Sequence, residues 1–164
     1  MNTENIRQVY ALDKEGKPQE AFDLICALAQ ENDPLALFEL STRYFPLQER
    51  PPEMLSIEQD EEKSKTYAIS GKAELQKLAD NNDGEAMRML AYLYLGHLCP
   101  YPRDLKEAEN WLLKSIDAGS DVAANDLAIF YQNTNIEKAR YWYQYAQEKG
   151  CRLIHNEELE TLGT

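Results

Sequence analysis

Residues 83–119 read DGEAMRMLAYLYLGHLCPYPRDLKEAENWLLKSIDAG, and residues 120–150 repeat their pattern. A repeat of a few tens of residues with apolar side chains at helical spacing is typical of a solenoid, in which helix pairs bury their apolar faces against one another. The positions of the first stretch that recur in the second are Ala86, Leu90, Ala91, Tyr94, Ala108, Trp111 and Gly119, matched by Ala123, Leu127, Ala128, Tyr131, Ala139, Trp142 and Gly150.

A weaker copy of the template lies nearer the N-terminus, where Ala21, Leu28, Asn32, Ala36, Leu40, Ser41 and Tyr44 match Ala108, Ser115, Gly119, Ala123, Leu127, Ala128 and Tyr131. Helical spacing, Gly and Asn stops, and Asp caps extend the pattern over most of the chain. We therefore expect an all-α fold, an α/α solenoid or superhelix of about four helical hairpins. The predicted helices cover about residues 3–16, 19–31, 35–44, 64–79, 84–95, 104–118, 122–132 and 136–149.

The length of 164 residues predicts a single domain, 1–164. Within it we expect weak repeats over 1–45, an inserted loop over 46–63, repeats over 64–119 and 120–150, and a C-terminal tail over 151–164. Prolines and an acidic run interrupt the helical pattern in the loop, which has room for a short helical turn near residues 52–57. A second short turn is expected at residues 157–162.

The charge balance narrows the class of partner. Seventeen basic and twenty-nine acidic side chains give a net charge of −12, which disfavours nucleic acid and anionic membranes because both bind through Lys and Arg. A negative field accelerates encounter with a basic protein. The same acidity also serves ordinary solubility, so both interpretations stay open.

The cysteines Cys26, Cys99 and Cys151 are odd in number and irregularly spaced, which argues against a disulfide framework. Reduced thiols, the lack of an export signal and the lack of a long apolar run predict a cytoplasmic protein. His97 and His155 do not form metal-ligand spacing with these cysteines. We therefore expect no metal and no cofactor.

A helical wheel predicts a partner-binding face. The residues opposite the stacking positions Ala86 and Leu90, together with their equivalents in the other repeats, have no predicted stacking role. The four apolar members, Phe38, Met89, Tyr92 and Ile129, would form an exposed strip of the kind that binds proteins, unless the inserted loop or the tail covers it. The full set is Phe38, Glu39, Thr42, Glu85, Arg88, Met89, Tyr92, Asn125, Asp126 and Ile129.

The acidic run at residues 58–62 supplies a second candidate contact. Asp60, Glu61 and Glu62 are expected either to dock on a basic groove of the partner or to form a solvated loop. The chain offers no Gly-rich phosphate loop and no nucleophile beside a histidine. No catalytic residue is therefore predicted.

The repeat resembles a known family, the Sel-one-like repeat, a helix-turn-helix relative of the tetratricopeptide repeat. Ala91 and Ala128 stand where that family often has Gly, and Leu112 replaces an aromatic residue. The resemblance implies a solenoid that holds protein partners on a curved surface and has no catalytic residues to carry over. It is carried by Ala86, Leu90, Tyr94, Gly96, Asp104, Lys106, Ala108, Trp111, Lys114 and Gly119, and again by Ala123, Leu127, Tyr131, Lys138, Ala139, Trp142, Tyr143, Ala146 and Gly150.

Some small bacterial proteins of this family act as regulators or as immunity proteins that neutralise a toxin. We therefore expect a non-enzymatic protein-binding module that engages its partner through the concave face, in its most concrete form an inhibitor of a basic toxin or effector. The alternatives are a small hydrolase, as suggested for some family members, or a regulatory or structural adaptor subunit. A monomer or a small homo-oligomer is expected.

Overall fold

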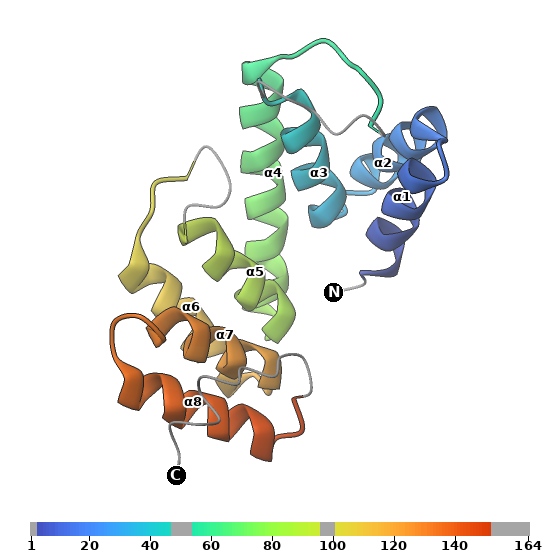
Figure 1. Ribbon diagram of the computed structural model, residues 1–164. Coiled ribbons are helices and arrows are strands. Elements are labelled where there is room, and N and C mark those ends of the chain that lie inside the picture. Colours follow the sequence, from blue (N-terminus) through green and yellow to red (C-terminus); the bar gives the residue numbers. More distant parts are fainter. Residues whose placement is uncertain (1–2, 47–53, 96–100, 152–164) are drawn as a thin grey trace. The chain divides into compact units, whose positions relative to one another are not determined.

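The computed structural model describes residues 3–46, 54–95 and 101–151 (Figure 1). This part of the chain contains eight α-helices and no strand, which confirms the all-α prediction. The helix bounds follow the predicted ones closely except at the start of α4. The helices are α1 (Glu4–Lys14), α2 (Pro18–Gln30), α3 (Pro34–Tyr44), α4 (Glu61–Asp80), α5 (Gly84–Tyr94), α6 (Leu105–Asp117), α7 (Asp121–Tyr131) and α8 (Ile136–Glu148).

Contacts within the chain divide it into two units, Met1–Lys77 and Leu78–Thr164. In the first unit α1 packs on α2 and α2 on α3, while Ser64 of α4 donates a 2.8 Å hydrogen bond to the carbonyl of Ser41 in α3. In the second unit α5 contacts α6, α6 contacts α7, and α7 contacts α8. Each unit thus joins helices that are consecutive in sequence. A single domain over the whole chain stays a prediction.

The repeated small and aliphatic residues form the core of the second unit. Ala86 and Leu90 of α5 are completely buried, and so are their counterparts Ala123 and Leu127 of α7. Alanine at these positions lets neighbouring helices approach closely, and leucine fills the space between them. The stacking role predicted from the repeat is therefore confirmed for these positions.

The ends of the helices repeat as well. Gly119 follows α6 with a φ of 96°, and Asn32 follows α2 with a φ of 62°. Both occupy the left-handed conformation that closes a helix, which Gly adopts freely and Asn tolerates better than most residues. The next amides, of Ser120 and Asp33, bond back to the carbonyls of Ser115 at 3.0 Å and Leu28 at 3.1 Å. This agreement supports the alignment of the weak early repeat with the clear ones.

The acidic run belongs to a helix rather than to a loop. Helix α4 begins at Glu61, so Glu61 and Glu62 lie in its first turn, and Asp60 accepts a 2.9 Å hydrogen bond from the amide of Lys63. That hydrogen bond lowers the pKa of Asp60. The prediction of a loop through residue 63 is wrong, because carboxylates next to a helix N-terminus cap it and interact favourably with its dipole.

The loop that precedes α4 is only partly described. Residues 54–60 carry no helix. The helical turn expected near residues 52–57 is therefore absent from the part of that range that the structure describes, and residues 47–53 lie outside the description. The turn expected at residues 157–162 also lies outside the described residues.

Candidate functional site

Phe38, a member of the predicted strip, is a core residue of the first unit. Its side chain is 6% exposed, and a Cβ built at Gly71 of α4 would lie 3.0 Å from Cε2 of its ring. The ring therefore occupies the space that the missing side chain of Gly71 leaves. The expected exposure of Phe38 is wrong because α3 packs against both α2 and α4, whereas the wheel assigned it one buried face.

Glu39 is also buried, in an ionic cluster that the sequence analysis missed. Arg43, Asp13 and Glu39 are 2%, 3% and 8% exposed. The Arg43 guanidinium donates to Asp13 and, from Nε at 3.0 Å, to Glu39, while the Tyr10 hydroxyl donates to Glu39 at 3.0 Å. Burial, followed by the charge of Glu39, raises the pKa of Tyr10. Glu39 thus links α3 to α1, and it is not available to a partner.

Thr42 completes the first-unit residues of the predicted face. Its side chain is partly exposed, and its hydroxyl donates a 3.1 Å hydrogen bond to the carbonyl of Phe38. Of the three first-unit residues of the predicted face, Thr42 is therefore the one that a partner could still reach.

The second-unit residues divide into buried and accessible ones. Asn125 is 2% exposed, so its predicted accessibility is wrong. Glu85, Met89 and Tyr92 are partly exposed. Ile129 of α7 is 43% exposed.

Arg88 connects two repeats through its guanidinium. Nε and Nη2 donate to the carboxylate of Glu85 at 2.8 and 2.7 Å, and Nη1 donates to Asp126 of α7 at 3.0 Å. The Tyr92 ring lies 5.3 Å from the guanidinium carbon, within cation–π range. Arg88 therefore does have a stacking role, because it bridges α5 and α7, and the prediction that it has none is wrong.

Burial and the contacts within this cluster shift the pKa values of Arg88, Asp126 and Tyr92. Burial lowers the pKa of Arg88, but the hydrogen bonds with Glu85 and Asp126 outweigh it, so the pKa is raised. Burial raises the pKa of Asp126 although Arg88 and Tyr92 oppose the shift. Burial and the charge of Asp126 raise the pKa of Tyr92 to about 12. At neutral pH Tyr92 is therefore a neutral hydroxyl beside a paired guanidinium.

Replacing Arg88 with glutamine is expected to raise the pKa of Asp126 further, because the guanidinium that lowers it is lost. A carboxyl with a raised folded pKa contributes stability that is fully present below its unfolded pKa of about 3.9 and is lost as the pH rises through the folded value. The variant should therefore be less stable than the wild type at neutral pH, and the difference should narrow as the pH falls from the folded pKa of Asp126 toward about 4.

Carboxyl NMR of Asp126 measures the shift directly, and urea unfolding at several pH values measures the stability. Glu85 and Tyr92 face the same guanidinium, so their signals are followed as well. Arg7→Gln is the control, since Arg7 is 72% exposed and lies 3.7 Å from Glu4. An unchanged Asp126 pKa in Arg88→Gln would show that the ion pair is absent in solution.

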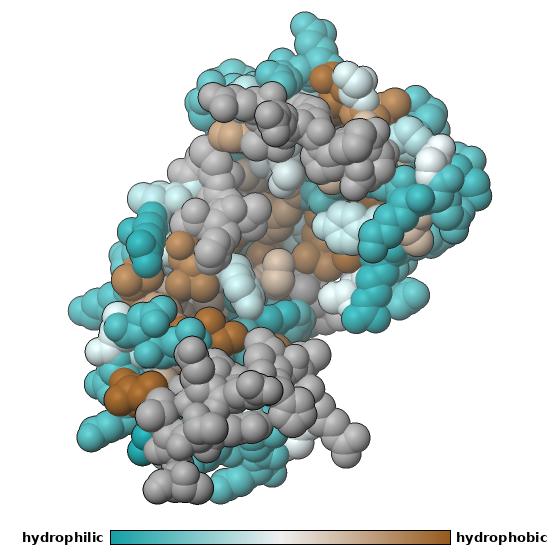
Figure 2. All heavy atoms as spheres, in the orientation of Figure 1, coloured by the Kyte–Doolittle hydropathy of each residue, from teal (hydrophilic) through white to brown (hydrophobic). Residues whose placement is uncertain are grey.

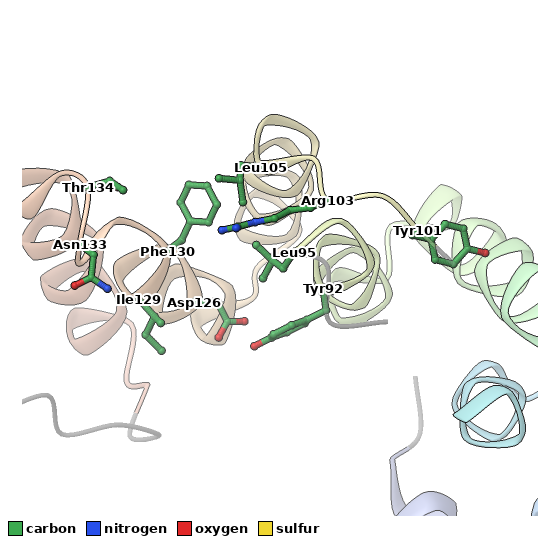
Figure 3. A pocket seen from close by; sticks show the side chains of 10 residues that line it. All are labelled: Tyr92, Leu95, Tyr101, Arg103, Leu105, Asp126, Ile129, Phe130, Asn133 and Thr134. Atoms are coloured by element: carbon green, nitrogen blue, oxygen red, sulfur yellow. The ribbon is translucent and has the colours of Figure 1, made fainter. Parts of the chain in front are cut away.

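A groove beside this cluster is the candidate site. It encloses about 770 Å³ within the second unit (Figure 3), and we call it the α5–α7 groove. Two strongly exposed aliphatic side chains, Leu105 at 41% and Ile129 at 43%, face it. Figure 3 shows Leu105, Arg103 and Phe130 close together, whereas Tyr101 stands apart from the other side chains in this view. The lining residues are Tyr92, Leu95, Tyr101, Arg103, Leu105, Asp126, Ile129, Phe130, Asn133 and Thr134.

The groove contains part of the predicted face and several residues that the sequence analysis missed. Tyr92, Asp126 and Ile129 were predicted, whereas Leu95, Arg103, Leu105 and Phe130 were not. One sequence feature could have indicated Leu105 as an exposed apolar residue, because it directly follows the helix cap Asp104. The wheel treated each helix alone and therefore missed the contribution of residues 101–105.

The described residues contain no group of three His, Cys, Asp or Glu side chains that could hold a metal ion. His97, Cys99 and His155, the histidines and cysteine weighed for metal binding, lie outside the described residues. None of the helices in the described part has the length and apolar character needed to cross a bilayer.

Comparison with solved structures identifies the fold. A Sel1 repeat protein from Oxalobacter formigenes matches 88% of this chain with 24% sequence identity and a TM-score of 0.52, and the chain spans 56% of that protein. A protective antigen of uropathogenic Escherichia coli strains with an SLR fold matches 87% of the chain with 16% identity and a TM-score of 0.46, over 38% of its own length. No family model and no curated protein matches the chain.

The likeness to the Oxalobacter formigenes protein establishes the α/α-solenoid fold of Sel1 repeats for this chain. The resemblance seen in the residues is thus confirmed at the level of the fold. The chain spans little more than half of the length of that protein, and fold alone does not fix function.

Proposed function

Since the chain has the fold of Sel1 repeat proteins, we propose that it is a non-enzymatic module that binds a protein partner through the α5–α7 groove. The observation that carries the proposal is the pair of exposed aliphatic side chains, Leu105 and Ile129, beside half-buried aromatic ones. On the face that Figure 2 shows, hydrophilic residues outnumber apolar ones among the described residues. Apolar side chains that gather in a hollow of such a surface commonly mark an interaction site.

Only some residues of the predicted face remain candidate contacts of the partner. Tyr92 and Ile129 belong to the groove, and Thr42, Glu85 and Met89 remain candidate contacts because they are partly exposed. Arg88 acts through Asp126 and Tyr92, which it holds in place. Phe38, Glu39 and Asn125 are excluded as contacts because they are buried.

More specifically, we propose that the partner is a basic toxin or effector that this chain neutralises. The net charge of −12 supports a basic partner, because opposite net charges accelerate encounter. Glu61 and Glu62 are exposed in the first turn of α4 and would contribute to this field. The carboxylate of Asp60 accepts a hydrogen bond from the amide of Lys63, so Asp60 serves mainly as a helix cap.

Ile129→Glu is expected to reduce the amount of co-purified partner at least about tenfold, because it places a charge in the apolar wall of the groove. The tagged chain is expressed in cells of its source, and partners are quantified by mass spectrometry. Ile69→Glu is the matched control, since Ile69 of α4 is 61% exposed and belongs to the first unit. Equal unfolding curves for the two variants establish that both are folded.

Retention of a stoichiometric partner by Ile129→Glu would contradict the groove as the binding site. The proposal that the partner is a toxin is tested on the partner itself. It should arrest growth when expressed alone and should not do so when co-expressed with the wild-type chain. A partner with an acidic isoelectric point, or one without an effect on growth, would leave the binding proposal in place and remove the toxin proposal.

A further inference from the structure

The α5–α7 groove contains a cation that the rest of the described chain leaves without a partner. Arg103 lines the groove and is exposed, and no hydrogen bond or ion pair joins it to another described residue. Its neighbour in the groove wall, Asp126, is by contrast paired with Arg88 at 3.0 Å. The free charge that the groove presents is therefore positive, although the chain as a whole is strongly acidic.

The carboxylate nearest to Arg103 in sequence, that of Asp104, is engaged in a helix cap through one oxygen. Asp104 caps α6 by accepting hydrogen bonds from the amides of Lys106 at 3.1 Å and Glu107 at 3.0 Å. A cap of this kind holds the carboxylate against the first turn of the helix. Oδ1 of Asp104 is therefore engaged in the helix cap, and no ion pair joins this carboxylate to the guanidinium of Arg103 among the described residues.

Apolar side chains border Arg103 on one side. Figure 3 shows its side chain beside Leu105, with the nitrogen end directed toward Phe130. Ile129 continues the same wall from α7. Arg103 is exposed, but apolar side chains on one side of it reduce solvent screening, so an ion pair formed at this place is expected to be stronger than one on a fully open surface. A guanidinium also binds a carboxylate through two parallel hydrogen bonds, which fixes its orientation.

We propose that the α5–α7 groove binds a peptide segment of the partner in which Asp or Glu lies within three residues of a large apolar side chain. The carboxylate pairs with Arg103, and the apolar side chain packs against Leu105, Ile129 and Phe130. A groove of about 770 Å³ has room for several side chains rather than one. This inference rests on the proposed function and specifies the segment that the groove recognises.

An acidic anchor is compatible with a partner that is basic as a whole. Net charges act over about a Debye length of 8–10 Å and govern the rate of encounter, whereas the anchor is selected by the groups it touches after docking. The contact at Arg103 is therefore independent of the field that steers the partner toward the chain.

The test uses a display library of random dodecapeptides selected on the full-length wild-type chain, on Arg103→Glu and on Arg7→Glu. The wild type and Arg7→Glu should enrich peptides with Asp or Glu close to Leu, Ile, Phe, Tyr or Trp. Those peptides should bind Arg103→Glu about tenfold or more weakly, and selection on Arg103→Glu should enrich Lys or Arg instead. Arg7 is the control because it is exposed and lies in α1 of the first unit.

Two results would overturn the inference, and they differ in what they say of the proposed function. Selected peptides that lose binding to Ile129→Glu but lack acidic residues and bind Arg103→Glu normally would show that the groove binds peptides without an acidic anchor. In that case the proposed function stands. Failure of the wild type to enrich any peptide over Ile129→Glu would remove both the inference and the groove as a protein-binding site.

Discussion

Replacing Arg43 with methionine is expected to lower the free energy of unfolding by about 3–5 kcal/mol, the cost of removing one partner from a buried ionic cluster. Arg43 is buried and donates to both Asp13 and Glu39. The variant would leave two buried carboxylates without a cation. Methionine has a similar length and no charge, so it fills much of the space and isolates the electrostatic loss.

The balance of charge in the cluster makes this effect large, because the carboxylates of Asp13 and Glu39 share one guanidinium. Oδ1 of Asp13 and Nη1 of Arg43 already lack a hydrogen-bond partner, and such buried atoms cost the wild type free energy. Since the variant removes Nη1, the expected loss comes from the two carboxylates left without a cation. The remaining hydrogen bond from Tyr10 to Glu39 at 3.0 Å cannot replace the guanidinium, because it carries no charge.

Urea unfolding followed by circular dichroism measures the change. Arg7→Met is the control and should shift the free energy of unfolding by less than about 1 kcal/mol, since its ion pair is exposed. Adding Asp13→Asn to Arg43→Met should recover part of the loss, because it removes one of the two stranded charges. A single variant as stable as the wild type would show that the cluster does not stabilise the first unit.

Phe38→Ala is expected to lower the free energy of unfolding by about 3–5 kcal/mol, because it removes a buried aromatic ring and leaves a cavity. The ring fills the space above Gly71, where a Cβ would approach it to 3.0 Å. Helix α4 cannot close the cavity with a side chain at that position, since glycine has none. The loss should therefore lie within the ordinary range for buried phenylalanine rather than below it.

This variant also separates the two roles considered for Phe38. A core residue affects stability, whereas an exposed partner contact affects binding and leaves unfolding unchanged. Ile129→Ala is the matched control, and it should change the free energy of unfolding by less than about 1 kcal/mol while weakening partner binding. Unchanged stability of Phe38→Ala would contradict the placement of Phe38 in the core.

The local features of the chain were predictable from sequence. Helices appear where apolar residues recur at helical spacing, and the caps Asp83 and Asp104 lie at the predicted starts. Both features depend on residues only a few positions apart, whose geometry a helix fixes. The start of α4 was misplaced because three consecutive acidic residues resemble a solvated loop in sequence, although they also suit a helix N-terminus.

The candidate site was predictable only in part. Tyr92 and Ile129, which line the groove, were predicted as contacts because each lies on the helix face opposite the stacking alanines. Phe38 was assigned wrongly by the same wheel, since α3 has a second neighbour in α4 that the wheel does not contain. Arg103 was missed because it lies between helices, where helical spacing carries no information.

The repeat beginning DGEAM at residue 83 by itself determined the helices α5 to α8, their ends and their alanine and leucine core. These features depend on spacing within a few residues and on a pattern repeated along the chain. Tertiary structure alone decided which polar side chains are accessible. Arg43 reaches Asp13 in α1, and Arg88 reaches Asp126 in α7. A charge or an aromatic ring on a helix face becomes a core residue or a binding residue according to the neighbour that the fold places against it.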